Sequence, residues 1–122
     1  MKTILVVDDE RHIVDLLRLY LEQEGFAVVA ARDGHEALRL AERHDPDLIV
    51  LDLMLGELDG LSICEILRAQ PSTSDIPVIV ITAMEGTIPR FHALDSGATD
   101  YLTKPFSPRD LLQRAERIIL RR

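Results

Sequence analysis

The chain has 122 residues, 47% of them hydrophobic and 29% charged, and a formal net charge of −7. This length fits a single domain, expected to span residues 1–122, and leaves no room for two. Because an acidic surface repels phosphate groups, the charge argues against direct binding to nucleic acid or to an anionic membrane.

Five apolar runs alternate along the chain with five segments in which apolar residues recur at helical spacing. The apolar runs predict strands, which in chain order cover residues 4–7, 26–31, 48–51, 77–81 and 100–103. The helical segments follow them in turn, over residues 13–21, 34–44, 60–69, 88–96 and 108–119. Since the strands are apolar at both alternating positions, each is expected to be covered on both faces. This indicates an α/β domain with a parallel sheet.

Short motifs mark the ends of several expected helices. Asp33, followed three residues later by Glu36, has the pattern of a capping box. Ser107 is the expected N-cap of the last helix, with Pro108 at the favoured first position. Gly97 is expected to end the fourth helix.

The single cysteine, Cys64, cannot form an intramolecular disulfide, and its place in an amphipathic segment predicts a semi-buried structural thiol. The N-terminus leads almost at once into the first expected strand, without a signal peptide or a long apolar run. A cytoplasmic location is therefore expected.

Polar residues follow the carboxyl ends of four expected strands: Asp8 and Asp9, Asp52, Thr82, and Lys104. In a doubly wound sheet these ends lie along one edge, where such folds bind ligands. Three clustered carboxylates repel one another unless a cation joins them, and oxygen ligands suit Mg²⁺. Each residue alone is better explained as a turn, cap or surface residue. The set as a whole predicts a functional site.

The chemistry of this set fits transfer of a phosphoryl group. Lys104 supplies a point charge able to hold a phosphoryl oxygen, and Thr82 can donate a hydrogen bond to a second oxygen. A carboxylate among these groups can act as a nucleophile toward phosphorus, forming an aspartyl phosphate. The metal and the lysine would offset charge in the transition state.

Over its whole length the sequence resembles the receiver domains of bacterial response regulators. The matching segments are ILVVDDE (4–10), PDLIVLDLML (46–55), DG (59–60), PVIVITA (77–83) and GATDYLTKPF (97–106). The resemblance implies a flavodoxin-like (CheY-like) parallel sheet with strand order 2-1-3-4-5 and five helices on its two faces. It also implies that a histidine kinase phosphorylates Asp52 in a Mg²⁺-dependent reaction. Such a domain catalyses its own phosphorylation and dephosphorylation only.

The resemblance assigns further roles at this site. Asp9 would bind Mg²⁺ directly, Asp8 largely through water, and Asp52 and the backbone carbonyl of Met54 would complete the protein ligands. Thr82 and Lys104 would contact the phosphoryl group. Tyr101 would change rotamer to fill the space that Thr82 vacates, and the bond between Lys104 and Pro105 would be cis.

The C-terminal part resembles receivers of winged-helix (OmpR/PhoB-type) transcriptional regulators. In those proteins, charges pair across a symmetric dimer formed by the last two helices and the fifth strand. The corresponding charged residues here are Arg90, Asp100, Asp110, Arg114 and Arg121. The implied pairs are Arg90 with Asp110 and Asp100 with Arg114. Residues 71–77 also resemble receivers attached to cyclases and kinases, so the type of output remains open.

Three other functions fit the sequence less well. A phosphatase with an aspartate nucleophile would need Asp-x-Asp after the first strand and usually a cap insertion, whereas Asp8 and Asp9 are adjacent. A flavodoxin-like cofactor-binding module would need a phosphate-binding loop at the same place. A receiver-like scaffold that binds partners without phosphorylation would not need the complete set of site residues.

Overall fold

The computed structural model describes residues 1–55 and 58–120. Within them the chain forms one parallel sheet of five strands, in the order β2-β1-β3-β4-β5. The strands are β1 (Thr3–Val7), β2 (Ala27–Ala31), β3 (Leu48–Asp52), β4 (Val78–Thr82) and β5 (Asp100–Thr103). The helices are α1 (Arg11–Gln23), α2 (Gly34–His44), α3 (Gly60–Ala69), α4 (Thr87–Asp95) and α5 (Pro108–Leu120). This confirms the predicted α/β architecture.

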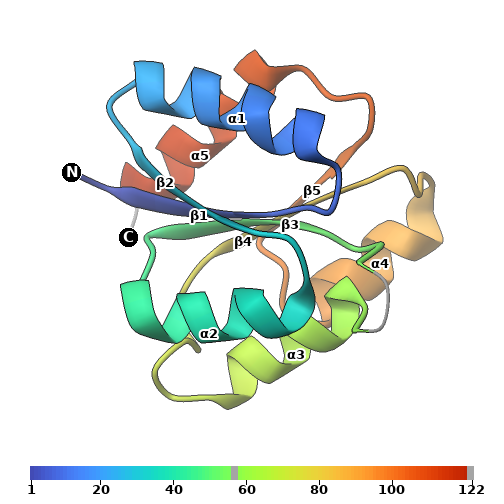
Figure 1. Ribbon diagram of the computed structural model, residues 1–122. Helices are drawn as coiled ribbons and strands as arrows, with labels where there is room; N and C mark the ends of the chain where they lie inside the picture. The colour runs from blue at the N-terminus through green and yellow to red at the C-terminus, as the bar shows by residue number, and fades with distance from the viewer. Residues whose placement is uncertain (56–57, 121–122) are drawn as a thin grey trace.

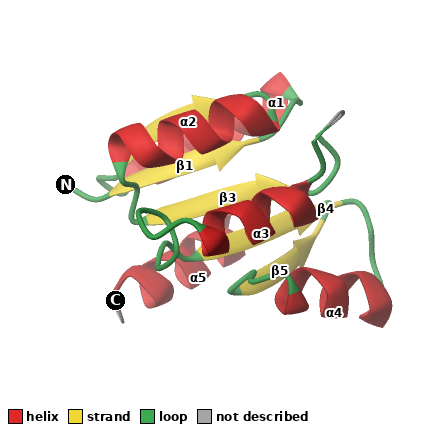
Figure 2. Cartoon of the chain, turned by 90° about the horizontal axis from the view of Figure 1, so that it is seen from below, coloured by secondary structure: helices red, strands yellow, loops and turns green. Residues whose placement is uncertain are grey.

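The helices divide into two layers, with α1 and α5 on one face of the sheet and α2, α3 and α4 on the other (Figure 1). Seen at a right angle to that view, the strands run in a common direction between the helices (Figure 2). Each connection therefore crosses over the sheet through a helix, as parallel pairing requires. Among the described residues, no helix combines the length and apolar character needed to cross a membrane.

The predicted elements are confirmed in type and order, with small shifts at their ends. Strand β2 starts at Ala27 rather than at Phe26, because the Phe26 N–H bonds back to the Leu21 carbonyl at the end of α1 (3.1 Å). Strand β4 starts at Val78 rather than at Pro77, which has no N–H to donate. Helix α4 starts one residue earlier than predicted and ends one residue earlier.

The predicted helix caps are present with one difference. The Asp33 side chain accepts a bond from the Glu36 N–H (2.8 Å), and the Ser107 hydroxyl accepts one from the Asp110 N–H (3.3 Å). The Glu36 carboxylate, however, accepts from the N–H of Arg32 (2.9 Å) and not from that of Asp33, so the capping box is shifted by one residue. Gly97 follows α4 with φ +110°, as its place after the helix predicted.

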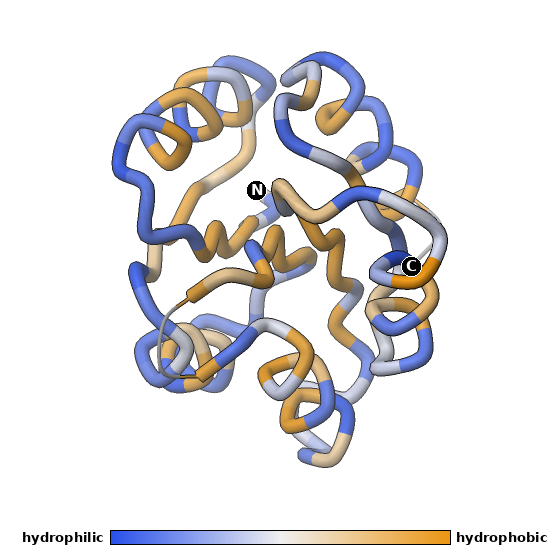
Figure 3. The backbone as a smooth tube through the Cα atoms, turned by 90° about the vertical axis from the view of Figure 1, so that its right-hand side faces the viewer, coloured by the Kyte–Doolittle hydropathy of each residue, from blue (hydrophilic) through white to orange (hydrophobic). Residues whose placement is uncertain are grey.

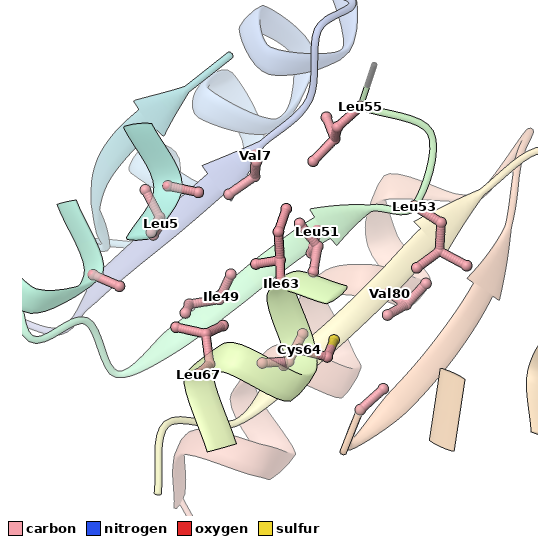
Figure 4. Close-up of a cluster of buried hydrophobic side chains, with 14 of the residues drawn as sticks. Leu5, Val7, Ile49, Leu51, Leu53, Leu55, Ile63, Cys64, Leu67 and Val80 are labelled. Atoms are coloured by element: carbon pink, nitrogen blue, oxygen red, sulfur yellow. The ribbon is translucent and has the colours of Figure 1, made fainter. Parts of the chain in front are cut away.

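Alternate residues of the strands pack into two separate cores. Leu5, Val7, Ile49, Leu51 and Val80 face α2 and α3, where they meet a cluster that includes Ala37, Ile63, Cys64 and Leu67 (Figure 4). Their neighbours Ile4, Val6, Val50, Ile79 and Ile81 face α1 and α5 on the other side. This explains why the strands read as continuous apolar runs. Each fully buried Leu or Ile side chain contributes about 1.5–3 kcal/mol through removal from water.

The hydrophobic residues gather along the strands and the inner sides of the helices, while the outer helix turns are polar (Figure 3). Cys64 belongs to this interior. It is 1% exposed, and burial raises the pKa of its thiol to about 11. The cysteine is thus more deeply buried than the sequence predicted, which agrees with a structural role.

Two glycines that open helices differ in what surrounds them. A Cβ at Gly60 would lie 2.6 Å from Leu53 Cα and 2.9 Å from the Asp52 carbonyl oxygen, both backbone atoms. At Gly34 it would meet flexible side chains, with Ile63 Cδ1 at 2.8 Å.

Because backbone yields less easily than side chains, we expect Gly60→Ala to lower the free energy of unfolding by about 2 kcal/mol more than Gly34→Ala. Urea denaturation of the two variants measures the difference. Equal losses would show that the close approach of α3 to β3 is not a tight constraint.

Candidate functional site

The carboxyl ends of four strands meet at the right-hand edge of the sheet in Figure 1. Asp8 follows β1, Asp52 ends β3, Thr82 ends β4, and Lys104 follows β5. Pairing of Val7 with Leu51 and of Asp52 with Ile81 aligns the strand ends. The residues selected from the sequence are therefore brought to one edge, and Asp8, Asp52 and Thr82 are buried there.

Lys104 is the centre of the site. Its ammonium Nζ donates hydrogen bonds to Asp8 Oδ2 (2.9 Å), to Asp52 Oδ2 (3.0 Å) and to Glu10 Oε1 (3.0 Å). Its side chain is 12% exposed, so the contacts to Asp8 and Asp52 are largely shielded from solvent, whereas the Glu10 carboxylate faces solvent. The bond between Lys104 and Pro105 is cis, as predicted.

Burial and charge act in opposite directions on these groups. Burial raises the pKa of Asp8, although hydrogen bonds from the Glu10 N–H and Lys104 oppose the shift. Burial also disfavours the charged form of Lys104. Its hydrogen bonds to Asp8, Asp52 and Glu10 outweigh that effect, and its pKa is raised. The Lys104 hydrogen bond in turn lowers the pKa of Glu10.

Four carboxylates at this edge could hold a cation together. Asp8, Asp9, Glu10 and Asp52 each offer an oxygen, and these atoms lie within 4.8 Å of one another. Asp8 and Asp52 are buried, whereas Asp9 and Glu10 are exposed. Oxygen ligands with access to water are the set that Mg²⁺ prefers, because it retains part of its hydration shell. The donor set therefore fits the predicted metal.

Glu10 was not among the residues predicted for this site. It stands at the N-cap of α1, where its side chain makes no capping bond and binds Lys104 instead. Its position next to Asp8 and Asp9 in the sequence was the available signal. What the sequence does not indicate is that the start of α1 turns this carboxylate back toward β5.

Thr82 and Tyr101 meet at the backbone of Met84. The Thr82 hydroxyl oxygen accepts a hydrogen bond from the Met84 N–H (3.3 Å), and the Tyr101 hydroxyl donates to the Met84 carbonyl. Tyr101 lies inward, with 3% of its surface exposed. Burial raises the pKa of its hydroxyl, with a smaller opposing effect from Arg90.

Three of the charged residues predicted for a dimer surface, Asp100, Asp110 and Arg114, contact one another within a single chain. Arg114 Nη1 binds both carboxylate oxygens of Asp100 (2.9 and 2.8 Å), and its Nε binds Asp110 (3.2 Å). Arg90 Nη1 donates to the Tyr101 carbonyl oxygen at 3.5 Å. The Asp100–Arg114 contact thus forms without a second copy. Arg121 lies outside the described residues.

Comparison with known proteins identifies the family. A family model described as the response regulator receiver domain matches residues 4–116. The chain is 48% identical over 120 residues to the alkaline phosphatase synthesis transcriptional regulatory protein PhoP of Bacillus subtilis, a match that covers 98% of this chain and 49% of that protein. It is 45% identical over 122 residues to the DNA-binding dual master transcriptional regulator RpaA of Synechocystis, a match that covers 100% of this chain and 50% of that protein.

Solved structures agree with this result. The receiver domain of the Francisella response regulator 1452 matches with a TM-score of 0.93 and 38% identity, over 99% of this chain and 98% of that one. The chemotaxis protein CheY4 of Vibrio cholerae matches with a TM-score of 0.90 and 30% identity, over 97% of this chain and 98% of that one. The chain belongs to the response regulator receiver domain family, which confirms the resemblance noted from its sequence. It spans about half the length of the curated relatives it matches.

Proposed function

We propose that this domain is a phosphorylation-activated signalling switch and that Asp52 accepts the phosphoryl group from a histidine kinase. The observation that carries the proposal is the contact of Asp52 with Lys104 (3.0 Å) inside a cluster of carboxylates able to share a divalent cation. The domain would act on itself alone and would not turn over free substrates. We propose that it extends over residues 1–122.

In the proposed transfer, a carboxylate oxygen of Asp52 attacks phosphorus while the bond from phosphorus to the kinase imidazole breaks. The imidazole leaves with the bonding electrons and takes up a proton. Lys104 would stay charged, because its raised pKa keeps it protonated, and would hold one phosphoryl oxygen. The buried Thr82 hydroxyl would donate to another oxygen. When bound, Mg²⁺ would offset the remaining negative charge on the phosphoryl group.

The contacts of the two aspartates after β1 support different roles toward the metal. Both oxygens of Asp8 are already engaged, Oδ1 by the Glu10 N–H (2.9 Å) and Oδ2 by Lys104 (2.9 Å). Asp9 is exposed beside them. We therefore propose that Asp9 binds Mg²⁺ directly and Asp8 largely through water, with Asp52 and the Met54 carbonyl completing the protein ligands.

The output of the switch is proposed to run through Thr82 and Tyr101. If the Thr82 hydroxyl turns to a phosphoryl oxygen, it gives up the bond from the Met84 N–H, and the segment that Tyr101 also contacts must adjust. The affected surface consists of α4, β5 and α5. We propose that it forms a homodimer or acts on an output domain, as the family relation to transcriptional regulators supports.

We expect Asp52→Asn to abolish phosphorylation and to leave the fold intact, because the amide has nearly the same shape but is a far poorer nucleophile. Intact mass after incubation with acetyl phosphate and Mg²⁺ should show no phosphoryl adduct under conditions that label the wild-type protein, and peptide mapping locates any adduct that forms. Asp15→Asn, at an exposed position of α1, is the control and should label normally. Undiminished labelling of the Asp52→Asn variant, on the peptide that contains residue 52, would show that Asp52 is not the phosphorylated residue.

We expect Asp9→Ala to weaken Mg²⁺ binding by about tenfold or more, and Asp8→Ala to weaken it less, because loss of a direct ligand removes more binding energy. Calorimetric or NMR titration of each variant measures the affinity. Glu10→Gln shows whether the fourth carboxylate contributes. Equal or reversed losses for Asp8 and Asp9 would contradict the assigned roles.

We expect the phosphorylated state to self-associate through α4, β5 and α5. Sedimentation with and without a beryllofluoride mimic of the phosphoryl group measures this, and Arg114→Asp should reduce the association. Ion pairs exposed at the rim of such a dimer contribute only about 0–1 kcal/mol each, so they are expected to set its register more than its affinity. The part-buried Asp100–Arg114 pair, which forms within one chain, would have to exchange partners to take that role. A protein that binds the mimic but stays monomeric at high concentration would rule out this output for the isolated domain.

A further inference from the structure

The C-terminal end of α4 is fastened to α3 mainly by Arg68, beside a longer contact from the Ser96 hydroxyl to Glu65 Oε1 (3.5 Å). The Arg68 guanidinium donates to the Gly97 carbonyl through both Nε (3.0 Å) and Nη2 (2.8 Å). Its Nη1 donates to the carbonyls of Ser74 (3.1 Å) and Ile76 (2.6 Å). Arg68 thereby joins α3, the loop before β4 and the turn after α4. Two of these four bonds from a charged donor hold the turn after α4 and two hold the loop before β4, so Arg68 links both segments to α3 firmly.

The turn after α4 is shaped to receive that side chain. Gly97 has φ +110°, and a Cβ at this position would lie 2.6 Å from Arg68 Cγ. The backbone of the turn is also tied to the helix, since the Gly97 N–H donates to Leu94 and the Ala98 N–H to Ala93 (3.1 and 3.0 Å). The C-terminal end of α4 is therefore held by both side-chain and backbone bonds.

The N-terminal end of α4 is held less firmly, since its side-chain bond to β5, from Arg90 Nη1 to the Tyr101 carbonyl, is long (3.5 Å). Its N-cap is Gly86, with φ +111° and no side-chain capping bond, and the first turn closes through a long bond from the Arg90 N–H to the Gly86 carbonyl (3.4 Å). Ile88 is 70% exposed, whereas the buried residue of this helix is Ala93, toward its other end. A segment with little burial and weak capping opens more easily than its surroundings.

The segment that leads into this weakly held end is tied through Met84. Its N–H donates to Thr82, and its carbonyl accepts from Tyr101. Both partners are the residues proposed above to respond to phosphorylation. A change at Thr82 would therefore reach the N-terminal end of α4 without touching the Arg68 attachment.

We propose that Arg68 is the pivot of α4: it holds the C-terminal end against α3 while the N-terminal end swings. The trigger of this motion rests on the phosphorylation switch proposed above. The helix has nine residues and is about 13 Å long, so a rotation of about 15° at Gly97 displaces its first turn by about 3.5 Å. The exposed Ile88 and Phe91 would move with it. Arg68 is a positioning residue, since it acts only through the backbone it binds.

Amide hydrogen exchange followed by NMR tests the pivot in the unphosphorylated protein, with two variants that act on opposite ends. Arg68→Met keeps the aliphatic stem but removes the donors. It should accelerate exchange at Ser96, Gly97 and Ala98 by about tenfold and leave Arg90 and Phe91 within about threefold. Thr82→Ala should instead accelerate exchange at Arg90 and Phe91 and leave Ser96, Gly97 and Ala98 nearly unchanged. Arg68→Lys should restore part of the protection that Arg68→Met removes at the C-terminal end.

The control is Arg18→Met, since Arg18 donates to the Val28 carbonyl (3.1 Å) on the opposite layer and should change neither end of α4. If Arg68→Met accelerates both ends equally, or neither end, Arg68 is not the pivot. Acetyl phosphate labelling of the wild-type and Arg68→Met samples, whose site residues are all unchanged, keeps the two proposals apart. Wild-type protein that is not labelled at Asp52 overturns the phosphorylation switch, whereas the exchange pattern alone decides whether α4 is held at Arg68.

Discussion

The site depends on the contact of one shielded ammonium group with carboxylates from distant parts of the chain. Lys104 joins the ends of β1, β3 and β5 through its bonds to Asp8 and Asp52, which lie 96 and 52 residues away in sequence. Burial alone would favour the neutral forms of Lys104 and Asp8, and their mutual hydrogen bonds oppose this. A buried charge left without its partner costs several kcal/mol, so these residues hold one another in place. The same arrangement keeps Asp52 beside a cation.

The fold brings Lys104 to Asp8 and Asp52 because helices cover both faces of the sheet and leave only the strand ends open to polar groups. Polar groups have no place along the middle of such strands, and they appear where the strands emerge at the carboxyl edge. The first residue of α3 adds a constraint of its own, since Gly60 donates its N–H to the Leu53 carbonyl (3.0 Å) directly behind Asp52. The alternation of strands and helices thus explains both features: the covered strands form the apolar core, and their carboxyl ends form the polar site.

Much of this could be predicted from the sequence, because strand ends and caps are local signals. The apolar runs located all five strands, and the polar residues after them identified the groups around Lys104. Glu10 was missed because its role depends on the direction in which α1 leaves β1. No prediction was made for Arg68, because only the folded chain brings Gly97 to it from 29 residues away. Side chains that bind distant backbone leave no pattern of their own.

The burial of Cys64 has a practical consequence for measuring motion in this domain. With a thiol pKa of about 11 and a side chain enclosed by the core, its reactive thiolate is scarce at neutral pH. At pH 8 roughly one thiol in a thousand would be ionised even before access is considered. A fluorophore or spin label attached to a newly introduced surface cysteine would therefore report from that position, with little background from the native thiol. The wild-type chain can serve directly as the parent for such reporters.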